Sequence, residues 1–168
     1  MTGNTVDLPQ MLARREKRSH EQQSFINSHH SPLISFSMNI PGPVKTNNLI
    51  RKAFTLGKNA LLSQLENINA HILQASEIHE DTGDELLLAV SNADPQALKD
   101  IAVKIEDSSQ IGRLYDIDII DSSGHKLSRA VFRKCLICNK QAQECARSRT
   151  HSVSEMQDAI EKLLQTLP

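Results

Sequence analysis

Two aspartates stand two positions apart within the segment "GRLYDIDIID" at residues 112–121. Its isoleucines predict a β-strand, in which alternate side chains point to the same side. Asp116 and Asp118 would therefore share one face, while Ile117 between them would point to the core. Two adjacent carboxylates repel each other unless a cation lies between them, and Mg²⁺ prefers such oxygen ligands. The pair indicates metal-assisted phosphoryl or nucleotidyl transfer; the alternative is a solvated pair on an edge strand.

A second candidate is the segment "NIPGPVKT" at residues 39–46, which is expected to join a strand to a helix. A helix N-terminus offers free N–H groups and the positive end of the helix dipole, which suit a phosphate group. Lys45 and Thr46 lie at that point. The alternative is a rigid turn with a surface lysine and a helix cap. The glycine and lysine spacing of a Walker loop is absent.

Positive charge gathers near the C-terminus although the whole chain has a formal net charge of -1. Residues 125–151 hold seven Lys or Arg residues and one acid, Glu144. Arg147, Arg149 and His151 would face one way in an extended segment, and arginine forks bind phosphate oxygens in pairs. The alternative is a solvated basic loop. Nucleic acid is a weaker option, because aromatic residues for base stacking hardly occur there.

All three cysteines lie in this basic segment. Cys135 and Cys138 form a C-x2-C pair, and Cys145 and His151 follow at a spacing that allows a Cys3His structural zinc site. Asn139 stands where such a knuckle often has glycine. Buried free thiols and a redox pair are the alternatives. Clustered cysteines, no apolar run of about 20 residues and no signal peptide predict a reduced, cytoplasmic protein without a membrane span.

The remaining elements follow from periodicity and from turn residues. A polar helix is expected at 8–30, strands near 33–40, 75–80, 85–90 and 125–132, and helices starting near 46, at 95 and after 152. The helix that starts near 46 should bury one stripe, formed by Ile50, Phe54, Leu61, Leu65, Ile68 and Ile72. We expect one α+β (mixed α/β) domain over 1–168, with a mixed sheet packed against helices.

Taken together, these segments resemble the apo-citrate lyase phosphoribosyl-dephospho-CoA transferases, also called holo-citrate lyase synthases. The matching stretches are "LARREKR", "NIPGPVKT", "GRLYDIDIID", "KLSR", "RKCLIC" and "CARSRTHS", which run in family order from about residue 11 to 155. The resemblance implies a nucleotidyltransferase type of enzyme and allows a nucleotidyltransferase-like fold. Such an enzyme takes triphosphoribosyl-dephospho-CoA, joins it to a serine of the citrate lyase acyl carrier (gamma) subunit and releases pyrophosphate.

Under this resemblance, Asp116 and Asp118 would hold Mg²⁺ as the catalytic pair. The phosphates would be bound by a set of basic residues: Lys45, Arg113, Arg147, Arg149 and His151. An aspartate or His151 would accept the serine proton. Two alternatives remain: the same transfer to another carrier, such as that of malonate decarboxylase, and a carrier-binding module without activity. The basic residues of the N-terminal helix, Arg14, Arg15, Lys17 and Arg18, would either touch the acidic carrier or form a solvated face.

Overall fold

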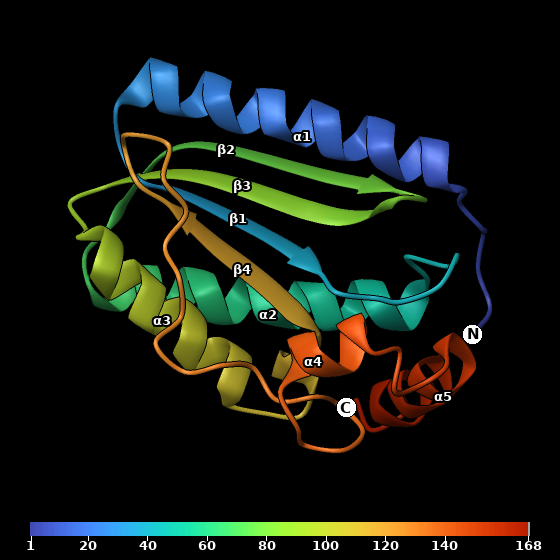
Figure 1. Ribbon diagram of the computed structural model, residues 1–168. Helices are drawn as coiled ribbons and strands as arrows, with labels where there is room; N and C mark the ends of the chain where they lie inside the picture. The colour runs from blue at the N-terminus through green and yellow to red at the C-terminus, as the bar shows by residue number, and fades with distance from the viewer. Residues whose placement is uncertain (168) are drawn as a thin grey trace.

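The computed structural model describes residues 1–167, and its centre is a four-stranded sheet (Figure 1). The strands are β1 (Leu33–Met38), β2 (His71–Glu80), β3 (Gly83–Ser91) and β4 (Tyr115–Ile120), in the spatial order β2-β3-β1-β4. Within the described residues every strand pair of the sheet is antiparallel. The expected α+β class is confirmed, but the sheet is antiparallel rather than mixed, since hairpin and helix connections return each strand against its neighbour.

Helices cover both faces of this sheet (Figure 1). The larger core lies under α2 (Asn48–Asn67) and α3 (Pro95–Asp107), where Phe36 of β1 stacks on Phe54 with ring centroids 4.8 Å apart. On the opposite face lies α1 (Leu8–His29), the helix expected at 8–30. β1, β3 and β4 thus bury one face under α2 and α3, whereas β2 is largely exposed. This burial fixes the register of the three strands and directs their alternate side chains towards α1.

The face under α1 is apolar at one end and polar at the other. Phe25 and Ile26 near the C-terminus of α1 pack on apolar residues of the sheet, namely Leu33, Leu87, Ala89 and Ile120. Further along the strands this face carries Ser35, Glu85 and Asp116 instead. A helix over such a surface needs polar side chains on its inner side, which explains why α1 is polar in sequence although it packs on the sheet.

The C-terminal part adds a short 3₁₀ turn (Ile111–Leu114) before β4, then α4 (Ala142–Arg147) and α5 (Val153–Leu164). Ser152 and Glu155 form the expected capping box of α5. Ile160 and Leu164 of α5 pack against Ile40 and Ile50 in a second core. Figure 1 shows α4 and α5 beside the end of the sheet where β4 begins, close to the N-terminus.

Two expectations about the elements are wrong. The helix that starts at Asn48 ends at Asn67, because the chain turns at Asn69 with a left-handed backbone (φ 55°), so Ile68 and Ile72 do not extend its buried stripe. Residues 125–132 form no strand: beyond a single bridge between Ile120 and Lys126 they pair with nothing in the sheet. Phe132 is 67% exposed there, which shows that no neighbouring strand or core covers it.

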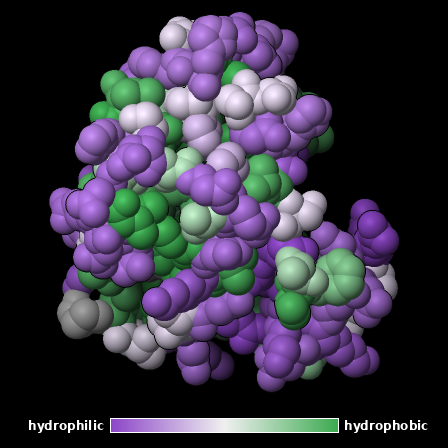
Figure 2. All heavy atoms as spheres, turned by 90° about the vertical axis from the view of Figure 1, so that its left-hand side faces the viewer, coloured by the Kyte–Doolittle hydropathy of each residue, from purple (hydrophilic) through white to green (hydrophobic). Residues whose placement is uncertain are grey.

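The described surface is largely polar. Seen from the left-hand side of Figure 1, hydrophobic residues show as patches between hydrophilic ones (Figure 2). Within residues 1–167, no helix is both long enough and apolar enough to cross a membrane.

Candidate active site and cysteine cluster

The two aspartates lie side by side on β4, which is an edge strand of the sheet. Asp116 is paired with Ser37 of β1, and Asp118 with Ser35. Both aspartates are half-buried, whereas Ile117 between them is buried on the opposite face. The expectation that the two carboxylates share one face is confirmed, and that face is the one under α1.

The two aspartates differ in their charged neighbours. Burial and the neighbouring Asp118 raise the pKa of Asp116, while Arg133, Lys126 and Arg18 act in the opposite direction. Asp118 has a direct partner, since Lys126 Nζ lies 2.5 Å from its Oδ2. No such ion pair forms at Asp116 within the described part of the chain. A carboxylate in this setting gains from a bound cation.

Asp116 lines a small pocket between α1 and the sheet, called here the aspartate pocket, with a volume of about 130 Å³. Its other walls carry Arg15 and Arg18 of α1 and Lys45 of the β1–α2 loop. Burial and the neighbouring Arg15 lower the pKa of Lys45, whose Nζ donates to the main-chain carbonyl of Ile40 at 2.7 Å. No carboxylate pairs with Arg15 or Lys45 among residues 1–167. The pocket therefore has two cations that form no ion pair within the described residues, although the carboxylates of Asp84, Glu85 and Asp116 also line it.

Buried ion pairs hold α1 in place above this pocket. Arg14, only 5% exposed, lies 2.6 Å from Glu85 of β3 and 3.0 Å from Glu21. Arg18 lies 3.0 Å from the other oxygen of Glu85. Next along the helix, Gln22 donates to Ser35 at 3.0 Å. Arg14, Arg18 and Gln22 recur at every fourth position, and this spacing is the sequence signal that could have identified the inner side of α1.

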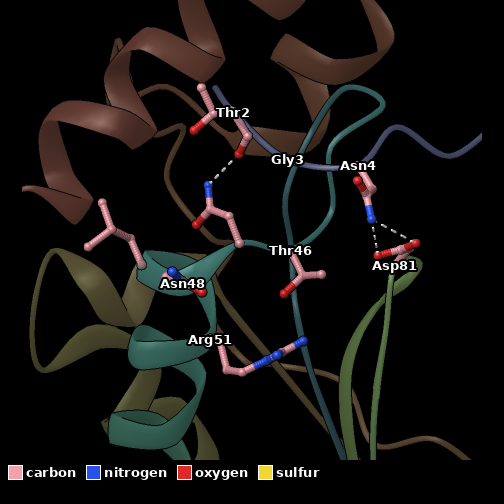
Figure 3. Close-up of a pocket in the computed structure, with 9 residues that line it drawn as sticks. Thr2, Gly3, Asn4, Thr46, Asn48, Arg51 and Asp81 are labelled. Carbon is pink, nitrogen blue, oxygen red and sulfur yellow. Dashed lines mark hydrogen bonds between the residues drawn. The ribbon is translucent and has the colours of Figure 1, made fainter.

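Lys45 and Thr46, expected to form one phosphate cradle, point in different directions. Thr46 is buried and donates to Asp84 at 2.8 Å. The start of α2 is capped by Asn47, whose side chain accepts from Ile50 N at 2.9 Å. Figure 3 shows the separate pocket at this helix start, with a volume of about 420 Å³, where Asn4 reaches Asp81. This pocket does not include Lys45, which lines the aspartate pocket.

A larger pocket of about 670 Å³ lies between α5 and the cysteine-bearing loop, and we call it the cysteine-side pocket. Arg113, Arg149 and His151 line it, whereas Lys45 and Asp116 line the aspartate pocket. Asn39 lines both pockets, so they meet at the end of β1. Apart from Asp118, Cys138 and Arg147, which line neither pocket, the site residues expected from the sequence thus fall into two adjoining groups.

Arg147 belongs to neither group. It is the last residue of α4 and is exposed, and Arg149 follows with a left-handed backbone (φ 47°). The extended arrangement that would align Arg147, Arg149 and His151 is therefore wrong. In an extended segment every second side chain points the same way, but α4 includes Arg147 and the backbone at Arg149 is left-handed. The side chains of Arg147, Arg149 and His151 therefore do not line up on one face.

The three cysteines and His151 converge on one point. Their ligand atoms all lie within 4.8 Å of one another, so these residues could hold a metal ion. Cys138 Sγ is 3.4 Å from Cys145 Sγ and 3.2 Å from His151 Nε2. Burial raises the pKa of the Cys135 thiol, but hydrogen bonds from the main chain of Cys138 and Ile137 outweigh it, so the pKa is lowered. His151 is thus placed with the cysteines.

Comparison with known proteins supplies the family. The family model described as "Apo-citrate lyase phosphoribosyl-dephospho-CoA transferase" matches residues 6–167. A protein of that name from Citrobacter koseri is 34% identical, over 97% of this chain and 91% of its own length. A "probable" enzyme of the same name from Vibrio cholerae is 34% identical (95% and 92%), and one from Escherichia coli is 32% identical (96% and 90%). The chain belongs to the apo-citrate lyase phosphoribosyl-dephospho-CoA transferase family.

Proposed function

We propose that this protein transfers the phosphoribosyl-dephospho-CoA group from triphosphoribosyl-dephospho-CoA to a serine of the acyl carrier (gamma) subunit of apo-citrate lyase, releasing pyrophosphate. The names of its relatives supply the transferred group and the acceptor enzyme. One observation in the structure supports this chemistry most directly: Asp116 shares a pocket with Arg15 and Lys45, which have no carboxylate partner among residues 1–167. Carboxylates for a divalent cation beside free cations for phosphate are what triphosphate chemistry requires.

The reaction is a displacement at the phosphorus nearest the ribose. The carrier serine oxygen forms a bond to this phosphorus, and the bond to the next phosphate breaks so that pyrophosphate leaves with the electron pair. In this proposal the serine proton passes to one of the two aspartates. His151 is the alternative base, but its Nε2 lies 3.2 Å from Cys138 Sγ, and we therefore assign it to the cysteine cluster. The nucleophile comes from the carrier, so this chain supplies positioning and charge.

In this proposal each of the two pockets binds a different part of the substrate. Arg15 and Lys45 bind the triphosphate at the aspartate pocket, while Arg18 stays paired with Glu85. The cysteine-side pocket receives the dephospho-CoA part, because its volume of about 670 Å³ lies in the range of nucleotide-sized sites and Arg149 on its wall suits a diphosphate. Arg113 also lines this pocket. Arg147, exposed on α4, would meet only parts of the substrate that extend outside the pockets.

The proposal includes two metal ions with separate tasks. Asp116 and Asp118 would hold Mg²⁺, which would supply positive charge for the phosphates. Zn²⁺ at the cysteine cluster takes no part in the displacement. Three reduced cysteines suit a reducing compartment, and we place the reaction in the cytoplasm.

The test is the intact mass of a purified apo carrier subunit after incubation with this protein, Mg²⁺ and triphosphoribosyl-dephospho-CoA. The wild type should add the mass of one prosthetic group, and Asp116→Asn should add none. Asp121→Asn is the matched control, since Asp121 lies in a turn and accepts from the Ser123 and His125 amides.

Other results of this carrier-modification experiment would change the proposal as follows. Modification by Asp116→Asn at the wild-type rate would remove the carboxylate pair from the mechanism. Modification of the malonate decarboxylase carrier alone would replace the acceptor. If neither carrier is modified by folded wild-type protein, the chain is a binding module and not the proposed enzyme.

A further inference from the structure

The segment that connects β4 to α5 has almost no core of its own. Within residues 131–151 only Cys135 and Cys145 are buried, while Val131 and Phe132 are 75% and 67% exposed. A short segment without apolar burial does not hold a fixed shape unless something else crosslinks it. Its two buried residues are both candidate metal ligands, so the burial that exists is centred on the cysteine cluster.

The backbone around the first two cysteines is already folded as a tight loop. Cys135 N donates to Lys140 O at 2.6 Å, and Lys134 forms a bridge with Gln141. Asn139 closes the loop with a left-handed backbone (φ 57°), the conformation for which glycine is common and asparagine is the usual substitute. Asn139 therefore serves the loop geometry that a two-cysteine knuckle requires.

The other two ligands come from the segment that follows. Cys145 lies in α4, and Thr150 N donates back to Cys145 O at 3.0 Å, so the chain turns towards the loop again. This turn brings His151 Nε2 to 3.2 Å from Cys138 Sγ. Three sulfur atoms and one imidazole nitrogen form the tetrahedral Cys3His set that Zn²⁺ prefers, whereas Mg²⁺ selects oxygen ligands.

The cluster is connected to the candidate active site through one side chain. Arg113 donates from its guanidinium to the main-chain carbonyls of Lys134, at 3.2 Å, and Cys135. It stands in the 3₁₀ turn that leads directly into the strand of Asp116. The cysteine loop is therefore attached to the turn before β4, and both form walls of the cysteine-side pocket.

We propose that Zn²⁺ bound by Cys135, Cys138, Cys145 and His151 is the crosslink that fixes residues 133–151 as the wall of the cysteine-side pocket. Arg113 transmits this order to the turn before β4. The ion thereby determines how well the pocket binds the dephospho-CoA part of the substrate, a role that rests on the proposed function. The zinc site itself does not depend on that function.

Metal content of the purified full-length chain, measured by mass spectrometry under reducing conditions, tests the site. We expect about one zinc ion per chain, its loss in Cys138→Ser and its retention in His151→Cys, which keeps a zinc ligand. His125→Ala is the matched control, because this exposed histidine lies outside the cluster and should leave the zinc content unchanged. Reduced wild-type protein that neither contains zinc nor takes it up would overturn the site.

Hydrogen exchange with and without a chelator tests the crosslink. Removal of zinc should speed exchange in residues 133–151 and leave β1 and β3 unchanged. Binding of dephospho-CoA alone, measured by calorimetry, should weaken by about tenfold or more, the effect of losing a charge-assisted contact. Unchanged exchange overturns the crosslink, and faster exchange with unchanged dephospho-CoA affinity overturns the link to the pocket.

Failure of this inference and failure of the proposed function are distinguishable. Asp116→Asn should lose transfer but keep zinc and dephospho-CoA binding. Wild-type protein that holds zinc and binds dephospho-CoA yet modifies no carrier would reject the proposed transfer and support the zinc-ordered pocket.

Discussion

Lys126 Nζ lies 2.5 Å from Asp118 Oδ2, on the carboxylate pair that we assign to a metal ion. The lysine reaches this position because the turn after β4 returns the chain, so that Lys126 forms a bridge with Ile120. Its side chain is 60% exposed, whereas that of Asp118 is 23% exposed. An exposed ammonium group is therefore the direct ion-pair partner of Asp118 in this structure, and Arg133 and Arg18 add to its effect on Asp116.

Replacement of Lys126 by methionine should make Mg²⁺ bind more tightly, because the ion no longer competes with the ammonium group for Asp118. Exposed ion pairs contribute about 0.2–1 kcal/mol, which corresponds to a decrease of up to about fivefold in the Mg²⁺ concentration for half-maximal transfer. The measurement is a Mg²⁺ titration of the transfer rate. A higher Mg²⁺ requirement in Lys126→Met would show that Lys126 assists metal binding instead of competing with it.

Arg15 and Lys45 should determine the affinity for the triphosphate. Alanine at either position removes a charge-assisted contact of about 1.5–3 kcal/mol and should raise KM for triphosphoribosyl-dephospho-CoA by roughly 10- to 100-fold. The matched control is Lys17→Ala, an exposed lysine on the same helix that does not line the pocket. If Lys17→Ala raises KM as much as Arg15→Ala, α1 acts through its overall charge and not through the pocket. A rise confined to KM for the carrier would assign α1 to docking.

The buried ion pair between Arg14 and Glu85 should be needed for stability. Glu85→Ala leaves Arg14 buried with only Glu21 nearby, and removal of one partner of a buried pair costs about 3–5 kcal/mol. Urea denaturation of the variant measures this loss of unfolding free energy. Glu77→Ala, which breaks the partly exposed pair with Lys58, should cost less than about 1 kcal/mol. Equal losses in the two variants would contradict a special role for Glu85.

The sequence predicted elements well where one side of an element is apolar. Alternating apolar residues predicted the strand with Asp116, and the spacing of Ser152 and Glu155 predicted a capping box. The structure confirms both. The end of α2 was not predictable in this way, because Ile68 and Ile72 continue the helical spacing beyond the turn at Asn69. Periodicity alone does not record where a helix stops.

The composition of the site was less predictable, because it depends on contacts between distant elements. Arg15 was assigned to a solvated or carrier-binding face, since nothing local indicates that β1, β4 and α1 place it beside Lys45. Lys45 and Thr46 are neighbours in sequence, yet Thr46 turns to Asp84. His151 was given three possible roles, as zinc ligand, phosphate-binding residue and base, and only the fold places it at Cys138. The spacing of residues within one segment does not predict such contacts between distant elements.

Gly57 of α2 should be essential for the packing of that helix on the sheet. A Cβ atom at this position would lie 2.7 Å from Phe36 Cζ and 2.9 Å from Tyr115 Cζ, which is closer than van der Waals contact allows. Gly57→Ala should therefore lower the unfolding free energy by about 1–3 kcal/mol, although alanine favours a helix more than glycine does.

Thermal unfolding measures the effect of Gly57→Ala, with Ser63→Ala on the exposed side of α2 as the control for helix propensity. Because Tyr115 begins the strand of Asp116, a displaced α2 should also disturb the aspartate pair, and transfer activity should fall in the folded variant. A variant as stable as Ser63→Ala and fully active would show that the helix can move away from Phe36 without cost, which would contradict the close packing seen here.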